Sequence, residues 1–553
     1  MKSLSRKILG AAAAAALVAG GALSAQDASD PSAASDSFSF DDVFASGAGG
    51  DSGSAGTAAP ALEFHGAATV DARAWLGTDP ADETNAVSAN PSVKLGFSWK
   101  GTNSELEGKL AFDEAAVKEN PADLLEEVTA RAFLGDFVLE AGKMKVVWGR
   151  GDKLHVLDPF NANDYTDFII PDYIDRRLAE PMARLSWNGP AGFRAEAVWT
   201  PTMTPDRLDM GGRWTPAQAT ALTEAGTGYV TYLSGLAYAA AYSEAYEAVW
   251  TQTKTAVYQQ AYAAAVTGGA DAAAAASMAA AAVATYVSDH NAEIIGTATG
   301  AASAKGLEAA QNVLMNYGSV DALLPDTKAL KYGQYGLRLT GTIGLADLGA
   351  EYYYGHFKTP SAKVTYGANA LGETAVTALD LDYDRLQIFG ADAAAAVGFL
   401  NLRGEIAWYL TDDVKGDDPA VHNNSLQWLA GFDIPVPVSN MALNVQEIGS
   451  WLYGSDGIES GADADWNADG KWTNNKLVVL LSDSWNHDKV KPEIACVWGI
   501  ERRDIYLQSK LSVTLKDGFS VIASGGYFIR TDTGEFAPYG ENNYAQLSAK
   551  YEF

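Results

Sequence analysis

Acidic and basic residues are concentrated between positions 148 and 180. Acidic and basic side chains lie there beside Pro159, Pro171 and the following Pro181, which favours an ordered loop. Fixed charges in a narrow passage select ions. We predict that this loop constricts a water-filled passage; a salt-bridged loop outside the passage is the alternative. The residues expected at the constriction are Arg150, Asp152, Lys153, Asp158, Asp172, Asp175, Arg176 and Arg177.

The sequence offers little support for a metal site, a disulfide or a catalytic site. Asp158, Asn161 and Asp164 offer oxygen ligands for calcium, but the glycine-centred spacing of an EF-hand is missing. The single cysteine, Cys496, excludes internal disulfides and a zinc site built on several thiolates. The six histidines are scattered, and no hydrolase constellation forms around them. The sequence therefore predicts no enzyme, no metal and no cofactor.

The elements around this loop alternate between apolar and polar residues from position 61 onward. In 93–100, for example, Val93, Leu95, Phe97 and Trp99 share one face, opposite Lys94 and Lys100. A charged face is costly to bury unless water reaches it, so we expect it to line a wet lumen. The residues predicted to face this lumen are Lys94, Glu107, Lys109, Arg194, Glu196, Arg338, Glu351, Arg403, Glu405 and Lys510.

The linkers between these strands decide between a soluble sandwich and a membrane barrel. Short linkers, such as 135–136 and 343–344, alternate with long ones, such as 148–179 and 201–329. This alternation is typical of outer-membrane barrels. The linker near 501–503 is short where a long one is due. The fold class predicted is an all-β transmembrane barrel of about 18 antiparallel strands, with 16 as the alternative, and an even number places both termini in the periplasm.

The two ends of the chain agree with export and barrel assembly. Residues 1–25 have a basic start, an alanine-rich apolar stretch and a small-residue cleavage site, which predicts a signal peptide. Residues 26–60 are rich in Ser, Ala, Gly and Asp, which predicts a disordered periplasmic linker before the barrel at 61–553. The last strand ends in Tyr551 and Phe553, an apolar stripe that we expect the barrel-assembly machinery to recognise.

The excess of acidic residues limits the classes of molecule that the protein is expected to bind. Asp and Glu number 69 against 39 Lys and Arg, a net charge of −30 over 553 residues, which argues against a nucleic-acid partner. The partners predicted are outer-membrane lipid, the assembly machinery and an unidentified small solute. Whether the chain forms a homo-oligomer is left open by the sequence.

Residues 216–316 depart from the strand pattern. Fifteen of the 25 residues at 261–285 are alanine, the strongest helix former. Tyr238, Tyr242, Tyr246 and Trp250 recur every four residues, on one face of a helix. Gly268 and Gly269 should end this helix, and Asp271 should cap the next. We predict an alanine-rich helical hairpin inserted in a long external loop; a plug in the lumen and a transmembrane helix are the alternatives.

Three segments resemble those of a known group of proteins. Trp148 and Gly149, followed by Asp158, Pro159 and Asn161, resemble a "WG…D-P-x-N" segment of a poorly characterised family of porin-like outer-membrane barrels from Gram-negative and spirochaete-type bacteria. Residues 334–339 with 351–354, and the layout of 491–553, are similar to other segments of that family. The resemblance implies a porin-like barrel in the outer membrane.

Three functions remain open on the sequence alone. The first is a porin-like channel for diffusion or facilitated uptake of small solutes. The second is a surface adhesin or receptor that acts through the helical insert. The third, a transporter of fatty-acid type, requires an apolar pocket in the lumen that the sequence does not locate.

Overall fold

The computed structural model describes residues 62–77, 87–152, 154–167, 173–318, 320–458, 464–467 and 469–553. The predicted signal peptide 1–25 and linker 26–60 lie outside these residues. The described chain forms two compact units. One unit holds a barrel of strands, and the other consists of Ala217–Pro325 and Ser361–Asp382.

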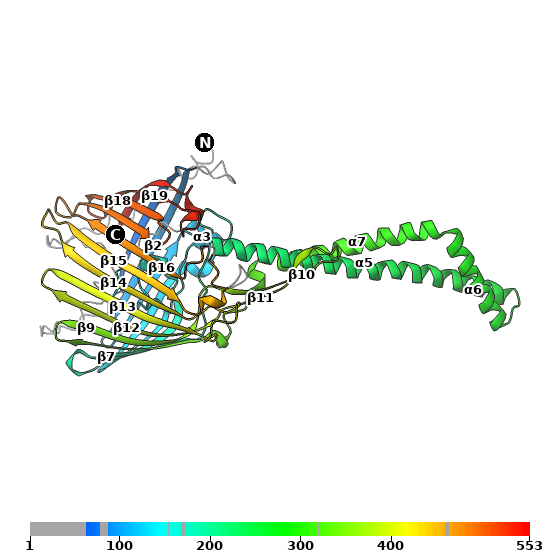
Figure 1. Ribbon diagram of the computed structural model, residues 1–553, viewed down its shortest axis with the longest axis horizontal. Helices are drawn as coiled ribbons and strands as arrows, with labels where there is room; N and C mark the ends of the chain where they lie inside the picture. Colours follow the sequence, from blue (N-terminus) through cyan, green and yellow to red (C-terminus); the bar gives the residue numbers. More distant parts are fainter. Residues whose placement is uncertain are drawn as a thin grey trace. The chain divides into compact units, whose positions relative to one another are not determined.

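Eighteen antiparallel strands close into the barrel (Figure 1). Each strand pairs with the next along the chain, and the last pairs with the first. The predicted fold class and strand number are confirmed. The strands are β1 (Leu62–Trp75), β2 (Val87–Lys100), β3 (Ser104–Phe112), β4 (Leu125–Leu134), β5 (Phe137–Met144), β6 (Glu180–Asn188), β7 (Arg194–Thr200), β8 (Gln334–Ile343), β9 (Ala346–His356), β12 (Arg385–Val397), β13 (Leu400–Thr411), β14 (Ser425–Pro435), β15 (Ala442–Leu452), β16 (Thr473–Ser482), β17 (Val490–Gly499), β18 (Ile505–Lys516), β19 (Phe519–Ile529) and β20 (Tyr544–Glu552).

The two faces of the barrel wall differ in chemistry because successive side chains in a strand point to opposite sides. In β13, Glu405 and Ala407 are buried, whereas Ile406 and Trp408 between and beside them are about half exposed. We call the apolar, exposed side the outer face and the polar side the inner face. A closed sheet leaves no strand edge unpaired, which is the condition for crossing a bilayer with strands.

The turns at one end of the barrel are tight. Gly135, Gly344, Gly398 and Gly518 occupy two-residue connections with φ of 66° to 72°. Side chains rarely adopt this left-handed conformation, so glycine suits these turns. At the other end the connections are longer, in the alternation that the sequence predicts. The connection 500–504 is the exception, and it is an abbreviated loop between two regular strands.

The barrel closes through the end of the chain. The backbones of Phe553 and Gly66 exchange two hydrogen bonds, N to O, of 2.8 and 3.0 Å. A Cβ atom at Gly66 would lie 2.8 Å from the Phe553 ring, so the glycine makes room for the terminal aromatic side chain. Tyr551 stacks on Phe553 with ring centroids 6.1 Å apart. The role of this end as an assembly signal stays a prediction.

Short helices occupy some of the loops. They are α3 (Glu114–Lys118), α4 (Tyr173–Arg176), η2 (Pro121–Leu124), η3 (Pro190–Gly192), η4 (Val320–Leu323), η5 (Leu330–Tyr332), η6 (Ser455–Gly457) and η7 (Ala537–Tyr539). Asp113 caps α3, since its carboxylate accepts a 2.8 Å hydrogen bond from the Ala116 N–H.

The second unit is the alanine-rich helical insert, as predicted. It contains α5 (Ala217–Thr267), α6 (Ala272–Asp289) and α7 (Asn291–Tyr317), with α6 and α7 both packed on α5 (Figure 1). Gly269 has a φ of +92° and ends α5, and Asp271 caps α6 by accepting a 2.8 Å bond from Ala274 N–H.

Small residues allow these helices to pack closely. Ala275 and Ala279 of α6 and Ala298 and Ala302 of α7 are fully buried. Tyr238, Tyr242 and Tyr246 stack along α5 at centroid distances of 5.9 and 6.2 Å, as their spacing predicts. None of the helices in the described ranges combines the length and hydropathy needed to cross a membrane.

The sequence missed a hairpin in this unit. Strands β10 (Ser361–Ala368) and β11 (Thr374–Asp382) pair only with each other, and β11 packs on α5. The hairpin lies in the connection between β9 and β12, where no strand was expected from the sequence. Its alternation is interrupted by a register shift between Thr365 and Tyr366, which obscures the strand signal.

Candidate constriction inside the barrel

The loop between β5 and β6 is described at residues 145–152, 154–167 and 173–179, and its described part contacts strands β13 and β15; we call it the crossing loop. Glu405, on the inner face of β13, holds it. Its Oε1 accepts hydrogen bonds from the backbone N–H groups of Arg150 and Gly151, both at 2.6 Å, and its Oε2 accepts one from Val156 N–H at 2.8 Å. The His155 ring nitrogen Nδ1 lies 3.1 Å from Oε1. One carboxylate thus fixes the backbone of the loop at three points.

A second attachment reaches further around the barrel. Asp152 N–H donates to the Gln446 side chain of β15 at 3.0 Å, and Gln446 Nε2 donates back to the Asp152 carbonyl at 2.6 Å. Asn444, also on β15, donates to the Asp152 carboxylate at 3.1 Å. Between β5 and β15 lie seven strands in one direction and nine in the other, so the two strands are nearly opposite. The loop therefore traverses the interior of the barrel.

A charged network surrounds the crossing. Arg150 Nε lies 3.0 Å from Asp392 Oδ1 on β12, and Arg338 of β8 lies 2.6 Å from Asp392 Oδ2. Arg338 Nε is also 3.4 Å from Glu351 of β9. The Asp392 side chain is fully enclosed. Buried charges of this kind are tolerated only when they are paired, and here two arginines flank the aspartate.

Beneath the charged segment, the crossing loop packs on the wall through apolar side chains. Trp148, Leu157 and Phe160 are completely buried. The Phe160 ring meets Trp148 and Tyr353 edge-on, at centroid distances of 5.0 and 5.2 Å. The neighbouring strands make room with glycine: a Cβ at Gly336 would lie 2.4 Å from the Phe160 ring. This part of the loop therefore belongs to the hydrophobic core of the barrel.

The other residues predicted at the constriction have separate roles. Arg177 is buried and pairs with Asp158, its Nη2 lying 3.1 Å from the carboxylate and 2.9 Å from the backbone carbonyl. Asp175 lies 3.3 Å from Lys94 of β2, and Arg176 stands over the Tyr165 ring. Lys153 and Asp172 lie outside the described residues. Arg150 and Asp152 thus share one crossing segment, and Asp158 and Arg177 stabilise the loop internally.

The residues predicted to face the lumen lie on the inner face of their strands. Most are paired there. Arg194 pairs with Glu196, Lys109 with Glu127 at 3.5 Å, and Arg403 with Asp433. No ion pair involves Glu107 or Lys510 among the described residues. The paired residues from this prediction are Lys94, Lys109, Arg194, Glu196, Arg338, Glu351, Arg403 and Glu405.

The sequence missed a second inward segment, at the start of the linker after β7. Trp214 is buried against an aromatic cluster from the opposite wall, with ring centroids 5.7 Å from Trp75 and 5.8 Å from Phe528. Arg207 ties this segment to the crossing loop, because its guanidinium lies 2.7 Å from the Asp164 carboxylate. The signal in the sequence was Trp214 itself, a large aromatic side chain in a segment expected to be a long loop.

At the end of the barrel with the longer loops, a cluster around His422 joins the connections that follow β9, β13 and β15. His422 Nδ1 lies 2.6 Å from Asp384 Oδ2, and its ring stacks on Phe357 at 4.5 Å. Although burial disfavours the charged ring, the hydrogen bond to Asp384 and the charges of Asp465 and Asp384 raise the pKa of His422. Burial in turn raises the pKa of Asp465.

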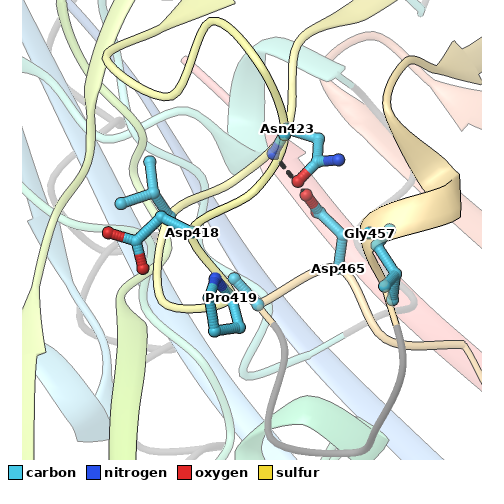
Figure 2. A pocket seen from close by; sticks show the side chains of 9 residues that line it. Asp418, Pro419, Asn423, Gly457 and Asp465 are labelled. Carbon is cyan, nitrogen blue, oxygen red and sulfur yellow. Dashed lines mark hydrogen bonds between the residues drawn. The ribbon is translucent and has the colours of Figure 1, made fainter.

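A small hollow adjoins this cluster. It lies between the loops after β13 and β15, where Asp465 accepts a 2.6 Å hydrogen bond from Asn423 N–H (Figure 2). Its volume of about 10 Å³ suits a single water molecule. The hollow is therefore no site for a solute, and the crossing loop remains the candidate functional site.

Three solved structures illustrate what the chain is similar to. A BenF-like porin from Pseudomonas fluorescens Pf-5 is 7% identical with a TM-score of 0.42, over 89% of this chain and 98% of that chain. OpdQ from Pseudomonas aeruginosa is 9% identical with a TM-score of 0.40, over 89% and 96%. OccAB3 from Acinetobacter baumannii is 9% identical with a TM-score of 0.39, over 89% and 99%. No curated protein sequence matches the chain. The model of one family, described as protein of unknown function DUF1302, matches residues 133–553, and the chain belongs to this family.

Proposed function

We propose that the protein is a porin-like outer-membrane channel whose crossing loop constricts the lumen. The observation that carries the proposal is the attachment of the loop backbone to Glu405 on β13 and to Gln446 on β15, a strand nearly opposite β5. A loop fixed across the interior narrows the path and brings its charges next to any permeating solute. An unobstructed barrel of eighteen strands would leave a wide aqueous channel.

The charges at the crossing support a preference for small cations. Asp392, Glu351 and Glu405 lie on the wall there, against Arg150 of the loop and Arg338 of β8. The whole chain is strongly acidic, with a net charge of −30. Acidic rings in a pore favour cations over anions. Small cationic and neutral polar solutes are therefore the substrates that we propose.

Chemical modification of single cysteines in a planar bilayer tests this function. In a Cys496→Ser background, Arg150→Cys would receive a positively charged methanethiosulfonate reagent, and Leu337→Cys on the outer face would serve as the control. We expect discrete conductance steps from both proteins, and a fall in conductance after modification at position 150 alone. Absence of any conductance would refute the channel. Equal insensitivity of the two variants would place the loop outside the solute path.

The helical unit supports a second candidate, a surface that contacts another molecule. Met278, Leu307 and Met315 are 58, 57 and 74% exposed, although they are large and apolar. Exposed apolar groups of this size often mark interaction sites. A surface adhesin or receptor would lose binding to cells or matrix when this unit is deleted, while its conductance stayed unchanged. A transporter of fatty-acid type is less well supported, because the apolar cluster inside the barrel is filled by Trp148 and Phe160.

A further inference from the structure

Glu447 lies on the outer face of the barrel, in the middle of β15. Its neighbours Gln446 and Ile448 point to the interior, where Gln446 binds the crossing loop. Glu447 itself pairs across the sheet with Ala430 and Leu477, which lie at the middle of β14 and β16. The carboxylate therefore sits at mid-height on the wall that faces the bilayer.

The polar contact of this carboxylate within the described residues comes from Trp428. The indole Nε1–H of Trp428 lies 3.0 and 3.3 Å from the two Glu447 oxygens. Gly449 allows this contact, since a Cβ there would lie 2.4 Å from the Trp428 ring. One indole donor leaves most of the acceptor capacity of a carboxylate unused. Acyl chains offer no donor at this depth, so an uncovered carboxylate is unfavourable.

Two further polar side chains share this part of the wall. Apart from aromatic residues, the outward polar side chains within two residues of a strand midpoint are Glu447 on β15, Cys496 on β17 and Ser509 on β18. Ser509 is exposed, and Cys496 is half-buried. All three belong to four consecutive strands of eighteen. The corresponding positions on the other strands are apolar or aromatic.

We propose that the wall β15–β18 is the contact surface for a second copy of this chain within the membrane. A two-fold axis along the membrane normal, between β16 and β17, sets β15 of each copy opposite β18 of the other. Glu447 then accepts a hydrogen bond from Ser509 of the second copy, twice in the dimer. The surface is self-complementary in this arrangement, because it carries an acceptor and a donor at equal distances from the axis. Cys496 lies next to the axis.

Cross-linking through the native cysteine tests the arrangement. The full-length protein, diluted in native outer-membrane vesicles, would be treated with a short membrane-permeant bis-methanethiosulfonate. We expect a cross-linked dimer from the natural chain and none from Cys496→Ser. The matched control is Ala130→Cys in the Cys496→Ser background, since Ala130 is also exposed at mid-strand, on β4 of the opposite wall. Equal cross-linking of both cysteines would reflect random collision and overturn the proposal.

Substitution of the paired residues provides the second measurement. Native mass spectrometry in mild detergent should show a dimer for the natural chain. Glu447→Leu and Ser509→Ala should each raise the dissociation constant at least tenfold. Glu447→Gln should keep most of the association, because the amide still accepts from a hydroxyl. If Glu447→Leu fails to fold, Ser509→Ala carries the test. A monomer under all conditions, or a cross-link to a different protein, would refute the second copy as the partner.

Discussion

Replacement of Glu405 by alanine should release the crossing loop from β13. The three backbone hydrogen bonds that this carboxylate accepts have lengths of 2.6, 2.6 and 2.8 Å. Hydrogen bonds to a charged group contribute about 1.5–3 kcal/mol each. Water in the lumen can replace part of the stabilisation from these hydrogen bonds, so we expect the attachment to weaken by about 3–5 kcal/mol. Since each 1.4 kcal/mol changes an equilibrium constant about tenfold, the detached state should become at least 100-fold more populated.

Single-channel recording in a planar bilayer measures this effect directly. The apolar seat of Trp148 and Phe160 remains, so the barrel should still insert, but Glu405→Ala should show a larger mean conductance and more open-channel noise. Glu107→Ala is the matched control, because Glu107 lies on the inner face of β3 and has no hydrogen bond to the loop among the described residues. Identical conductance and noise in Glu405→Ala and the natural protein would refute the role assigned to this attachment.

Three further predictions concern stability. Gly336→Leu should lower the thermal unfolding temperature, with a loss of about 1–3 kcal/mol, because its Cβ would lie 2.4 Å from the Phe160 ring; heat-modifiability on gels would report it. Because the pKa of His422 is raised in the folded state, its protonation stabilises the folded loops; this stabilisation is complete below about pH 6.5 and is lost as pH rises through the folded-state pKa. The hydrogen-exchange protection factors near His422, which are corrected for the intrinsic pH dependence of exchange, should therefore fall at alkaline pH, and His422→Gln should remove this fall. Deletion of 217–325 together with 361–382 should leave a folded, heat-modifiable barrel, since the strands satisfy their hydrogen bonds with each other; an aggregated product would contradict this.

The pattern of the sequence was sufficient for the barrel because the information there is local. Alternation along a strand assigns each side chain to a face, and the lengths of the linkers assign each turn to an end of the barrel. The helical insert was predictable for the same reason: alanine content, the break at Gly269 and the cap at Asp271 all act within a few residues. The hairpin β10–β11 was not predicted because a register shift interrupts the alternation of its residues.

The candidate site was only half predictable. Its composition, a loop of mixed charge beside a charged inner face, was visible in the sequence. The sequence did not show which partner each charged group binds, because Glu405 lies about 250 residues from the backbone groups that it binds. Arg177 illustrates the limit. The sequence placed it among the constriction residues, and the structure shows it buried against Asp158, where it stabilises the loop.

By itself, the sequence determined an antiparallel barrel of about 18 strands, the polarity of its two faces and the presence of a helical insert, since these follow from short-range periodicity and propensity. Only the tertiary structure decided that the crossing loop turns inward, that Trp214 joins it from another loop, and that Glu447 faces outward at mid-height. Those features depend on closure of the barrel, which brings strands far apart in the chain to opposite sides of one lumen and fixes which side chains meet.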